Sequence, residues 1–333
     1  MACGDAHTLI TTAGGKLFAF GRNQNGQLGL GHVDDVLQPV PVPTLADTNV
    51  VGVACGAEHS LAVTADGVVY AWGWGRYGNL GNGDCADRHV PTRAVGFPDD
   101  HHDNHHHNNT EGPSTSGSGS ADRVTQVQCG WRHSVCVTEA GEVYTFGWSK
   151  YGQLGHGDQT DRLTAHKIDP GRMDGPVASV VGGWRHTVAL TRSGRLYAWG
   201  WNRFGQLGCG DIVDRWAPVE IGAEVGPWTQ ARCGWRHTVA LTASGRVLAW
   251  GRGCNGQLGV GGKADIHVPT EVEALRAGTK VERWVDVQRV GRAAGLLVPD
   301  EAPSAAPDAV PLGGGVGDEE GEPPVKKART GVK

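Results

Sequence analysis

The segment Gly-Trp-Arg-His-Thr-Val-Ala-Leu-Thr occurs at residues 183–191 and again, unchanged, at residues 234–242, and Gly-Trp-Arg-His-Ser occurs at residues 130–134. Each copy is followed by a second motif, Gly-Gln-Leu-Gly. The His of the first motif and the Leu of the second keep the same spacing through five units, which defines a tandem repeat of about fifty residues. The two columns are His7, His59, His133, His186 and His237, and Leu28, Leu80, Leu154, Leu207 and Leu258.

Within a unit, the sequence predicts β-strands. In the third unit, runs rich in Val, Thr and Tyr at residues 124–129, 133–138 and 142–146 are separated by turns that contain glycine, which is the signature of strands and hairpins. A unit of about fifty residues with four short strands has the size of one propeller blade. We therefore predict an all-β fold, a β-propeller with five recognisable repeats over residues 1–291.

The composition argues against several classes of protein. The sequence has no apolar stretch long enough to cross a membrane and no charged-then-apolar leader. The net charge of −5 argues against bulk electrostatic binding to nucleic acid. No set of nucleophile and base recurs near the repeated motifs, so we do not expect an enzyme. Four cysteines occupy one repeat position and are expected to be small buried strand residues: Cys3, Cys55, Cys129 and Cys233.

An insertion at about residues 99–121 separates the second and third units. Its His run at residues 101–107 has the composition of a metal-binding tract. The surrounding Asn, Ser and Gly favour a disordered loop, so no metal site is predicted.

Two repeated columns are explained by packing. One His per blade places these side chains far apart around a ring, which favours a structural hydrogen bond inside each blade over metal binding. The aromatic residue near the end of each unit's third strand is expected in the blade core; this column is Phe20, Trp72, Phe146, Trp199 and Trp250.

The remaining conspicuous residues should share one face, because equivalent positions on successive blades lie side by side. Just before the repeated His, the first two units carry an acid, Asp5 or Glu58, and the next three carry Trp-Arg. These pairs are Trp131-Arg132, Trp184-Arg185 and Trp235-Arg236, and two further columns add Arg22, Trp74, Trp148, Trp201 and Arg252, and Asn25, Tyr77, Tyr151, Phe204 and Asn255.

A face with acid on one side and Trp-Arg on the other is self-complementary under a two-fold rotation, as in an isologous homodimer. The alternative is a face that binds a different acidic partner, because Trp and Arg anchor many interfaces.

The motifs Gly-Trp-Arg-His, GWGRYGNLG (residues 73–81) and GWSKYGQLGHGD (residues 147–158) resemble the regulator-of-chromosome-condensation propeller family and, within it, the UV-B photoreceptors of plants and green algae. The resemblance implies a seven-bladed propeller, a homodimer in the dark and an intrinsic Trp chromophore without a cofactor. It implies that Trp184 and Trp235 are the principal UV-B-sensing residues, with Trp131 in a supporting role.

The resemblance also implies the contacts of the dimer. Arg185 and Arg236, assisted by Arg132, would hold it through cation–π contacts and salt bridges. Arg22 and Glu58 would form a cross-subunit ion pair, and Arg203 and Arg252 would add further charge contacts.

Residues 292–333 are predicted to form a disordered regulatory tail, because Pro, Ala, Gly and acidic residues replace the repeat. The tail contains Val298-Pro299 and Val310-Pro311. The resemblance implies that a Val-Pro pair binds a WD-repeat E3 ubiquitin ligase of photomorphogenesis and that WD-repeat repressor proteins reset the dimer. It further implies residence in the cytoplasm and nucleus, where chromatin or transcription factors are possible partners.

The chain begins inside a blade and shows five units where this family has seven, so we expect about two N-terminal blades to be absent. Two other functions share the fold: a guanine-nucleotide exchange factor or chromatin-binding propeller, and a scaffold whose Trp residues anchor partners. Neither is expected to respond to UV-B.

Overall fold

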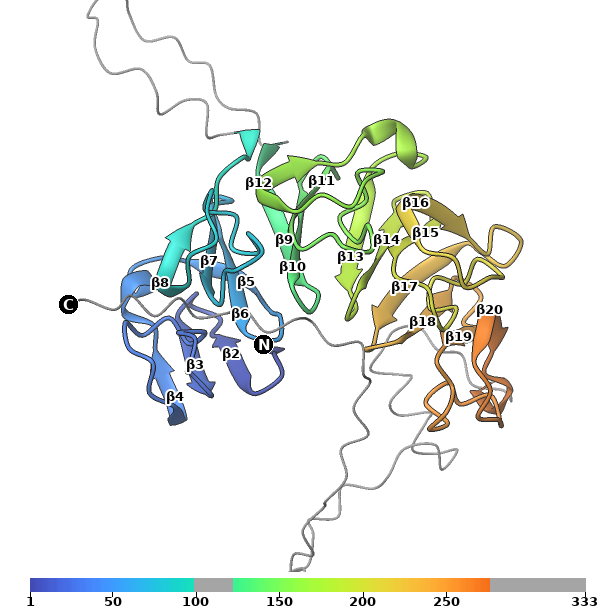
Figure 1. The fold of residues 1–333 in the computed structure, drawn as a ribbon, viewed down its shortest axis with the longest axis horizontal. Coiled ribbons are helices and arrows are strands. Elements are labelled where there is room, and N and C mark those ends of the chain that lie inside the picture. The colour runs from blue at the N-terminus through green and yellow to red at the C-terminus, as the bar shows by residue number, and fades with distance from the viewer. Residues whose placement is uncertain (99–121, 276–333) are drawn as a thin grey trace, which may run out of the picture. The chain divides into compact units, whose positions relative to one another are not determined.

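The computed structural model describes residues 1–98 and 122–275, so the predicted insertion and tail lie outside the described residues. Five four-stranded antiparallel sheets account for almost all of the secondary structure, which confirms the predicted all-β propeller repeats (Figure 1). We call the sheets blades 1 to 5 in chain order. Short 3₁₀ helices are η1 (Pro43–Leu45), η4 (Pro170–Arg172) and η5 (Glu273–Leu275).

Each blade is an up-and-down meander in which consecutive strands pair. The strands of blades 1 and 2 are β1 (Ala2–Cys3), β2 (His7–Thr11), β3 (Leu17–Gly21), β4 (Val36–Pro41), β5 (Val50–Cys55), β6 (His59–Thr64), β7 (Val69–Gly73) and β8 (Arg88–Arg93). Those of blades 3 to 5 are β9 (Val124–Cys129), β10 (His133–Thr138), β11 (Val143–Gly147), β12 (Arg162–Lys167), β13 (Val177–Gly182), β14 (His186–Thr191), β15 (Leu196–Gly200), β16 (Arg215–Ile221), β17 (Trp228–Cys233), β18 (His237–Thr242), β19 (Val247–Gly251) and β20 (Ile266–Glu271).

The hydrophobic core lies between successive blades. Each blade packs against the next, and the first strands of the blades contact one another in order. Trp72 of blade 2 is fully buried, and its indole nitrogen donates to the Gln27 carbonyl of blade 1. Trp199 of blade 4 makes the same bond to the Gln153 carbonyl of blade 3. The aromatic column is therefore core as predicted, except that Phe20 is only half-buried.

Four of the five repeated His residues bond to a hydroxyl of the next blade, so the prediction of a bond inside each blade was wrong. His59 Nε2 lies 3.1 Å from Ser134 Oγ of the next blade, and His133 Nε2 lies 3.0 Å from Thr187 Oγ1. The residue after each repeated His is a Ser or Thr. A blade can therefore bond to the next blade through its His ring and to the previous blade through this hydroxyl. We call this the His ladder; its other contacts are His7 to Ser60 at 3.0 Å and His186 to Thr238 at 3.2 Å.

The glycine of the Gly-Trp-Arg-His motif makes room for the ladder. A Cβ atom added at Gly130 would lie 1.9 Å from His133 Cε1 and 2.7 Å from the Gly183 carbonyl oxygen of the next blade. No side chain fits at such distances, so the glycine is required by packing.

The cysteine column departs from its prediction. Cys129 is buried, but Cys55 and Cys233 are half-buried and Cys3 is exposed. The position lines the opening between the first strands, so a strand residue there is not enclosed on every side. All eight cysteines are free thiols.

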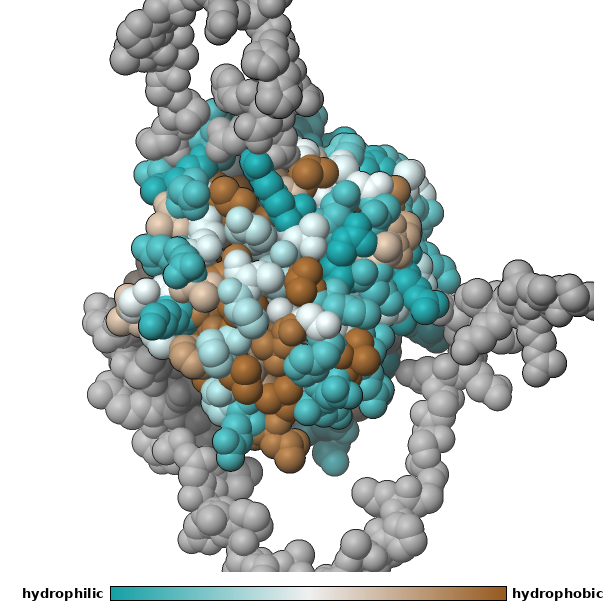
Figure 2. Space-filling model, turned by 90° about the vertical axis from the view of Figure 1, so that its left-hand side faces the viewer, coloured by the Kyte–Doolittle hydropathy of each residue, from teal (hydrophilic) through white to brown (hydrophobic). Residues whose placement is uncertain are grey.

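The outer edge of blade 1 exposes apolar side chains, among them Val33, Leu37 and Val40. Figure 2 views the side on which β4 and β8 lie in Figure 1, and apolar residues there are interspersed with polar ones. No helix in residues 1–98 or 122–275 has the length and hydropathy needed to cross a membrane.

Candidate functional site

Three tryptophans meet at the turns that join the first and second strands of blades 3, 4 and 5. Each precedes its Arg and the repeated His, so the tight strand connection places it at the end of the blade. The turns of neighbouring blades are tied together, because the Trp131 amide donates to the Trp184 carbonyl at 3.2 Å. The Trp131 and Trp184 rings are 5.3 Å apart, and the Trp184 and Trp235 rings are stacked at 6.0 Å with an interplanar angle of 17°. We call these three residues the Trp triad.

A second row of aromatic side chains lies beside the triad, on the loops between the third and fourth strands of blades 2, 3 and 4. Trp148 is 5.8 Å from Trp131, and Trp201 is 5.5 Å from Trp184, both edge to face. Successive members of this outer row are 5.3 to 5.9 Å apart, so the row is continuous; it consists of Trp74, Tyr77, Trp148, Tyr151, Trp201 and Phe204.

The arginine of each Trp-Arg pair reaches over the aromatic loop of the preceding blade. Arg132 Cζ lies 3.8 Å from the centroid of Trp131 and 4.7 Å from that of Trp74. Its guanidinium also donates to the Tyr77 hydroxyl at 3.3 Å. Each such cation–π contact contributes about 0.5–2 kcal/mol, more where water is excluded.

Within the triad, Trp184 has the largest set of ring and cation–π contacts. Arg185 Cζ lies 3.8 Å and Arg236 Cζ 4.6 Å from its ring centroid. Arg185 also donates to the Tyr151 hydroxyl at 2.9 Å, and Arg236 lies 5.3 Å from the Phe204 ring. We refer to the triad, the outer row and Arg132, Arg185 and Arg236 together as the Trp-Arg face.

Burial differs within this face. Trp148 and Trp201 are buried, Trp131 and Trp184 are half-buried, and Trp235 is 65% exposed. The most exposed indole thus lies at one end of the triad, where a partner surface could cover it.

The charged residues predicted for the dimer interface lie in different surroundings. Arg252 contacts the Trp-Arg face, with its Cζ 5.0 Å from the Phe204 ring. Arg22, Arg203 and Glu58 form no ion pair with residues of 1–98 or 122–275. Asp5 and the triad both line a central opening of about 210 Å³.

Sequence reasoning missed the tyrosine hydroxyls as arginine partners. The sequence contains a signal for these bonds: the same repeat position is Tyr77 and Tyr151 in blades 2 and 3 but Phe204 in blade 4, so a hydroxyl is available only in the first two. Val298, Pro299, Val310 and Pro311 lie outside the described residues. In the part of the chain that the structure describes, no cluster of His, Cys, Asp and Glu could hold a metal ion.

Comparison with known proteins places these observations in a family. The RCC1-like domain family matches residues 93–295, and the regulator of chromosome condensation (RCC1) repeat matches residues 14–63 and 50–79. The chain is 43% identical over 311 residues to the ultraviolet-B receptor UVR8 of Arabidopsis thaliana, covering 92% of this chain and 66% of that protein. It is 33% identical to the mitochondrial RCC1 domain-containing protein RUG3 of the same plant, covering 83% and 58%. The chain thus spans less than two thirds of the length of each of these relatives.

Solved structures agree on the fold. Human WBSCR16 superposes with a TM-score of 0.61 at 28% identity, over 73% of this chain and 57% of that one. Prp20p of Saccharomyces cerevisiae superposes with a TM-score of 0.63 over 80% and 61%, but its 21% identity shows the fold alone. Five blades of the expected type and a family match over residues 93–295 lead to one conclusion: this chain belongs to the RCC1-like domain family.

Proposed function

We propose that this protein is a UV-B receptor whose chromophore is the Trp triad. The observation that carries the proposal is the row of three indoles, with neighbours 5.3 and 6.0 Å apart, beneath arginine side chains. Indole absorbs in the near ultraviolet, so such a row needs no bound cofactor. The 43% identity to an ultraviolet-B receptor supports the same function.

The mechanism follows from the cation–π contacts. A guanidinium is attracted to the negative face of the indole, so a redistribution of charge in the excited ring weakens that attraction. Arg185 and Arg236 both contact Trp184, so one excitation weakens both contacts together. Each contact contributes only about 0.5–2 kcal/mol, which is why several must share a trigger.

The proposed readout is the dissociation of a homodimer held by the Trp-Arg face. Arg185, Arg236 and Arg132 would meet acidic groups of the second copy, and Arg22 would pair with Glu58 across the interface. The two acids Asp5 and Glu58 belong to blades 1 and 2, whereas the Trp-Arg pairs belong to blades 3 to 5. A two-fold rotation brings such halves together.

The proposed output resembles that of the UV-B photoreceptors named above. The monomer would present a Val-Pro pair, Val310-Pro311 or Val298-Pro299, to a WD-repeat E3 ubiquitin ligase in the cytoplasm and nucleus. WD-repeat repressor proteins would then restore the dimer. Support for this step is the resemblance of the chain to that family.

The alternative of an exchange factor or chromatin-binding propeller has weaker support. The solved structure of Prp20p is described with its binding to Gsp1p and histones, but at 21% identity the likeness extends to the fold alone.

The test is the mass of the purified protein in solution before and after UV-B, with no added ligand. The proposal predicts a dimer in the dark and half that mass after irradiation. A mass that UV-B leaves unchanged, together with binding to a small GTPase or to histones, would favour the alternative.

A further inference from the structure

The three blades that carry aromatic loops also carry an ion pair that the other two blades lack. Blade 4 pairs Arg215 with Asp211 at 2.5 Å. Blades 2 and 3 have the same pair four residues apart, Asp84 with Arg88 at 2.6 Å and Asp158 with Arg162 at 2.7 Å. We call this pair the Asp-Arg clamp.

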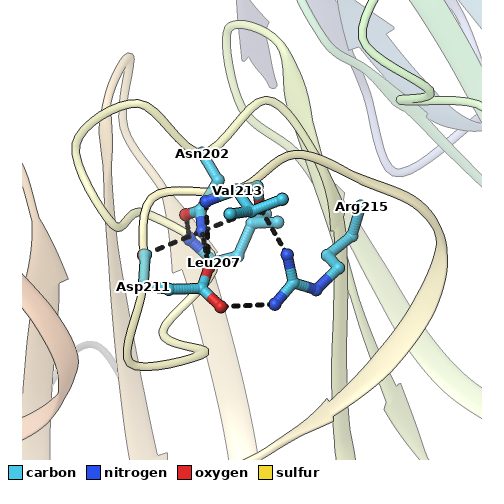
Figure 3. Close-up of polar contacts among 5 residues, drawn as sticks. All are labelled: Asn202, Leu207, Asp211, Val213 and Arg215. Carbon is cyan, nitrogen blue, oxygen red and sulfur yellow. Dashed lines mark hydrogen bonds and ion pairs between the residues drawn. The ribbon is translucent and has the colours of Figure 1, made fainter.

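The clamp has a fixed geometry, shown for blade 4 in Figure 3. Asp211 Oδ1 accepts from the Val213 amide at 2.9 Å, and Arg215 Nη1 donates to the Val213 carbonyl at 2.8 Å. Arg215 Nη2 donates to Asp211 Oδ2. The Val213 amide and the Arg215 guanidinium together hold the pKa of Asp211 below its usual value.

In blade 4 the clamp reaches both neighbours of the outer-row Trp201. The preceding residue, Gly200, is the cross-strand partner of Arg215. The following residue, Asn202, donates its side-chain amide to the Asp211 carbonyl at 3.0 Å and to the Val213 carbonyl at 3.2 Å (Figure 3). The backbone of Trp201 is thus fixed on both sides by the clamp loop.

Blades 2 and 3 repeat the clamp and its backbone pairing, but they have Gly75 and Ser149 where blade 4 has Asn202. Gly73, just before Trp74, pairs with Arg88, and Gly147, just before Trp148, pairs with Arg162. In each blade the next aspartate accepts from the amide that follows the Trp: Asp87 from Gly75 at 2.9 Å and Asp161 from Ser149 at 2.7 Å.

Blades 1 and 5 provide the internal comparison. Their loops keep the second aspartate contact, from Asn23 to Asp35 and from Gly253 to Asp265. They also keep the backbone pairing of the glycine at the end of the third strand, and in blade 1 the Asn23 side chain donates to the His32 carbonyl, so what these two blades lack is the Asp-Arg ion pair itself. At the two clamp positions they have His32 and Val36, and Gly262 and Ile266, and at the outer-row Trp position they have Arg22 and Arg252. The clamp therefore accompanies the aromatic loops and not the blade fold as such.

We propose that the three Asp-Arg clamps are positioning devices, which hold Trp74, Trp148 and Trp201 against the arginine of the next blade. The clamps of blades 3 and 4 also hold Trp148 and Trp201 against the triad. The role in light response rests on the function proposed above; the role in positioning does not. Trp201 lies 5.5 Å from Trp184 and 5.8 Å from Arg236, so a small displacement of its loop changes both contacts.

The test compares Arg215→Ala with Arg195→Ala by circular dichroism of the coupled indoles in the dark. Arg195 is a matched control, because it forms ion pairs with Asp174 and Glu220 in the same blade but at the opposite end of β15 and β16. We expect loss of part of the indole coupling signal in Arg215→Ala, partial recovery in Arg215→Lys, and the parent signal in Arg195→Ala.

A double-variant cycle ties the effect to one residue. In a Trp201→Phe background, Arg215→Ala should cause no further loss of the coupling signal. A parent-like signal in Arg215→Ala, or an equal loss in Arg195→Ala, overturns the positioning role. If Arg215→Ala does not fold, Arg215→Lys and Asp211→Asn decide the same question by the same signal. If UV-B leaves the mass of the parent protein unchanged, the receptor proposal is refuted. The comparison of circular dichroism in the dark still tests the positioning role.

Discussion

Trp184 holds the central place in the triad at the scale of single residues. It stacks on Trp235 at an interplanar angle of 17°, and Arg185 and Arg236 lie over it at 3.8 and 4.6 Å. Trp235, by contrast, is 65% exposed. The guanidinium groups shield the half-buried indole of Trp184 from water, so its emission should report their presence.

Arg236→Ala is expected to shift the tryptophan emission to longer wavelength, because removal of the guanidinium admits water to the Trp184 ring. Steady-state fluorescence measures the shift. Arg252→Ala is the matched control, since its guanidinium lies over Phe204. Equal shifts in the two variants would show that the emission does not report the contact between Arg236 and Trp184.

Gly130→Ala is expected to destabilise the fold by at least about 1–3 kcal/mol, the usual cost of overpacking, because the new methyl group would lie 1.9 Å from His133 Cε1. Urea unfolding measures the free energy. Gly262→Ala is the control, since nothing lies within 4 Å of its added Cβ. A Gly130→Ala protein as stable as the control would contradict the close packing of glycine against the ladder.

The His ladder links whole blades at the scale of structural elements. Burial lowers the pKa of His59, His133 and His186 to about 3, and that of His7 to about 4. The folded protein therefore holds these rings neutral, whereas the unfolded chain protonates them near the ordinary value of 6.5. Between these values the unfolded state binds more protons, so stability rises with pH.

Acidification from pH 6.5 toward pH 3 is expected to unfold the propeller, with each fully buried ladder His contributing up to about 1.4 kcal/mol per pH unit. Urea unfolding at several pH values gives this slope. His186→Gln should be less stable at neutral pH but lose less stability on acidification, because one titrating ring is gone. An unchanged slope in that variant would show that His186 does not contribute to the pH dependence.

At the scale of the whole molecule, the repeat columns predicted the blades, the strands and the membership of the Trp-Arg face. They could do so because equivalent residues of successive blades lie side by side. In the third blade the predicted strands at 124–129 and 133–138 are β9 and β10, and the third begins one residue from β11.

Contacts between blades could not be predicted in this way. A column of equivalent residues shows which residues occupy the same place in each blade but not which neighbour each one contacts. The repeat columns therefore predicted His hydrogen bonds inside the blades, whereas the bonds lie between them. The same limit hid the bond from Arg185 to the Tyr151 hydroxyl and the uneven burial of the cysteine column.

The central claim is that Trp184 absorbs the UV-B light that dissociates the dimer. The most direct test measures the molecular mass of the parent and two variants by light scattering after increasing doses of UV-B. Trp216→Phe is the matched control, because Trp216 is 45% exposed and lies outside the Trp-Arg face. We predict that the parent and Trp216→Phe fall from dimer to monomer mass at the same dose, while Trp184→Phe remains a dimer. Dissociation of Trp184→Phe at the parent dose would contradict the account.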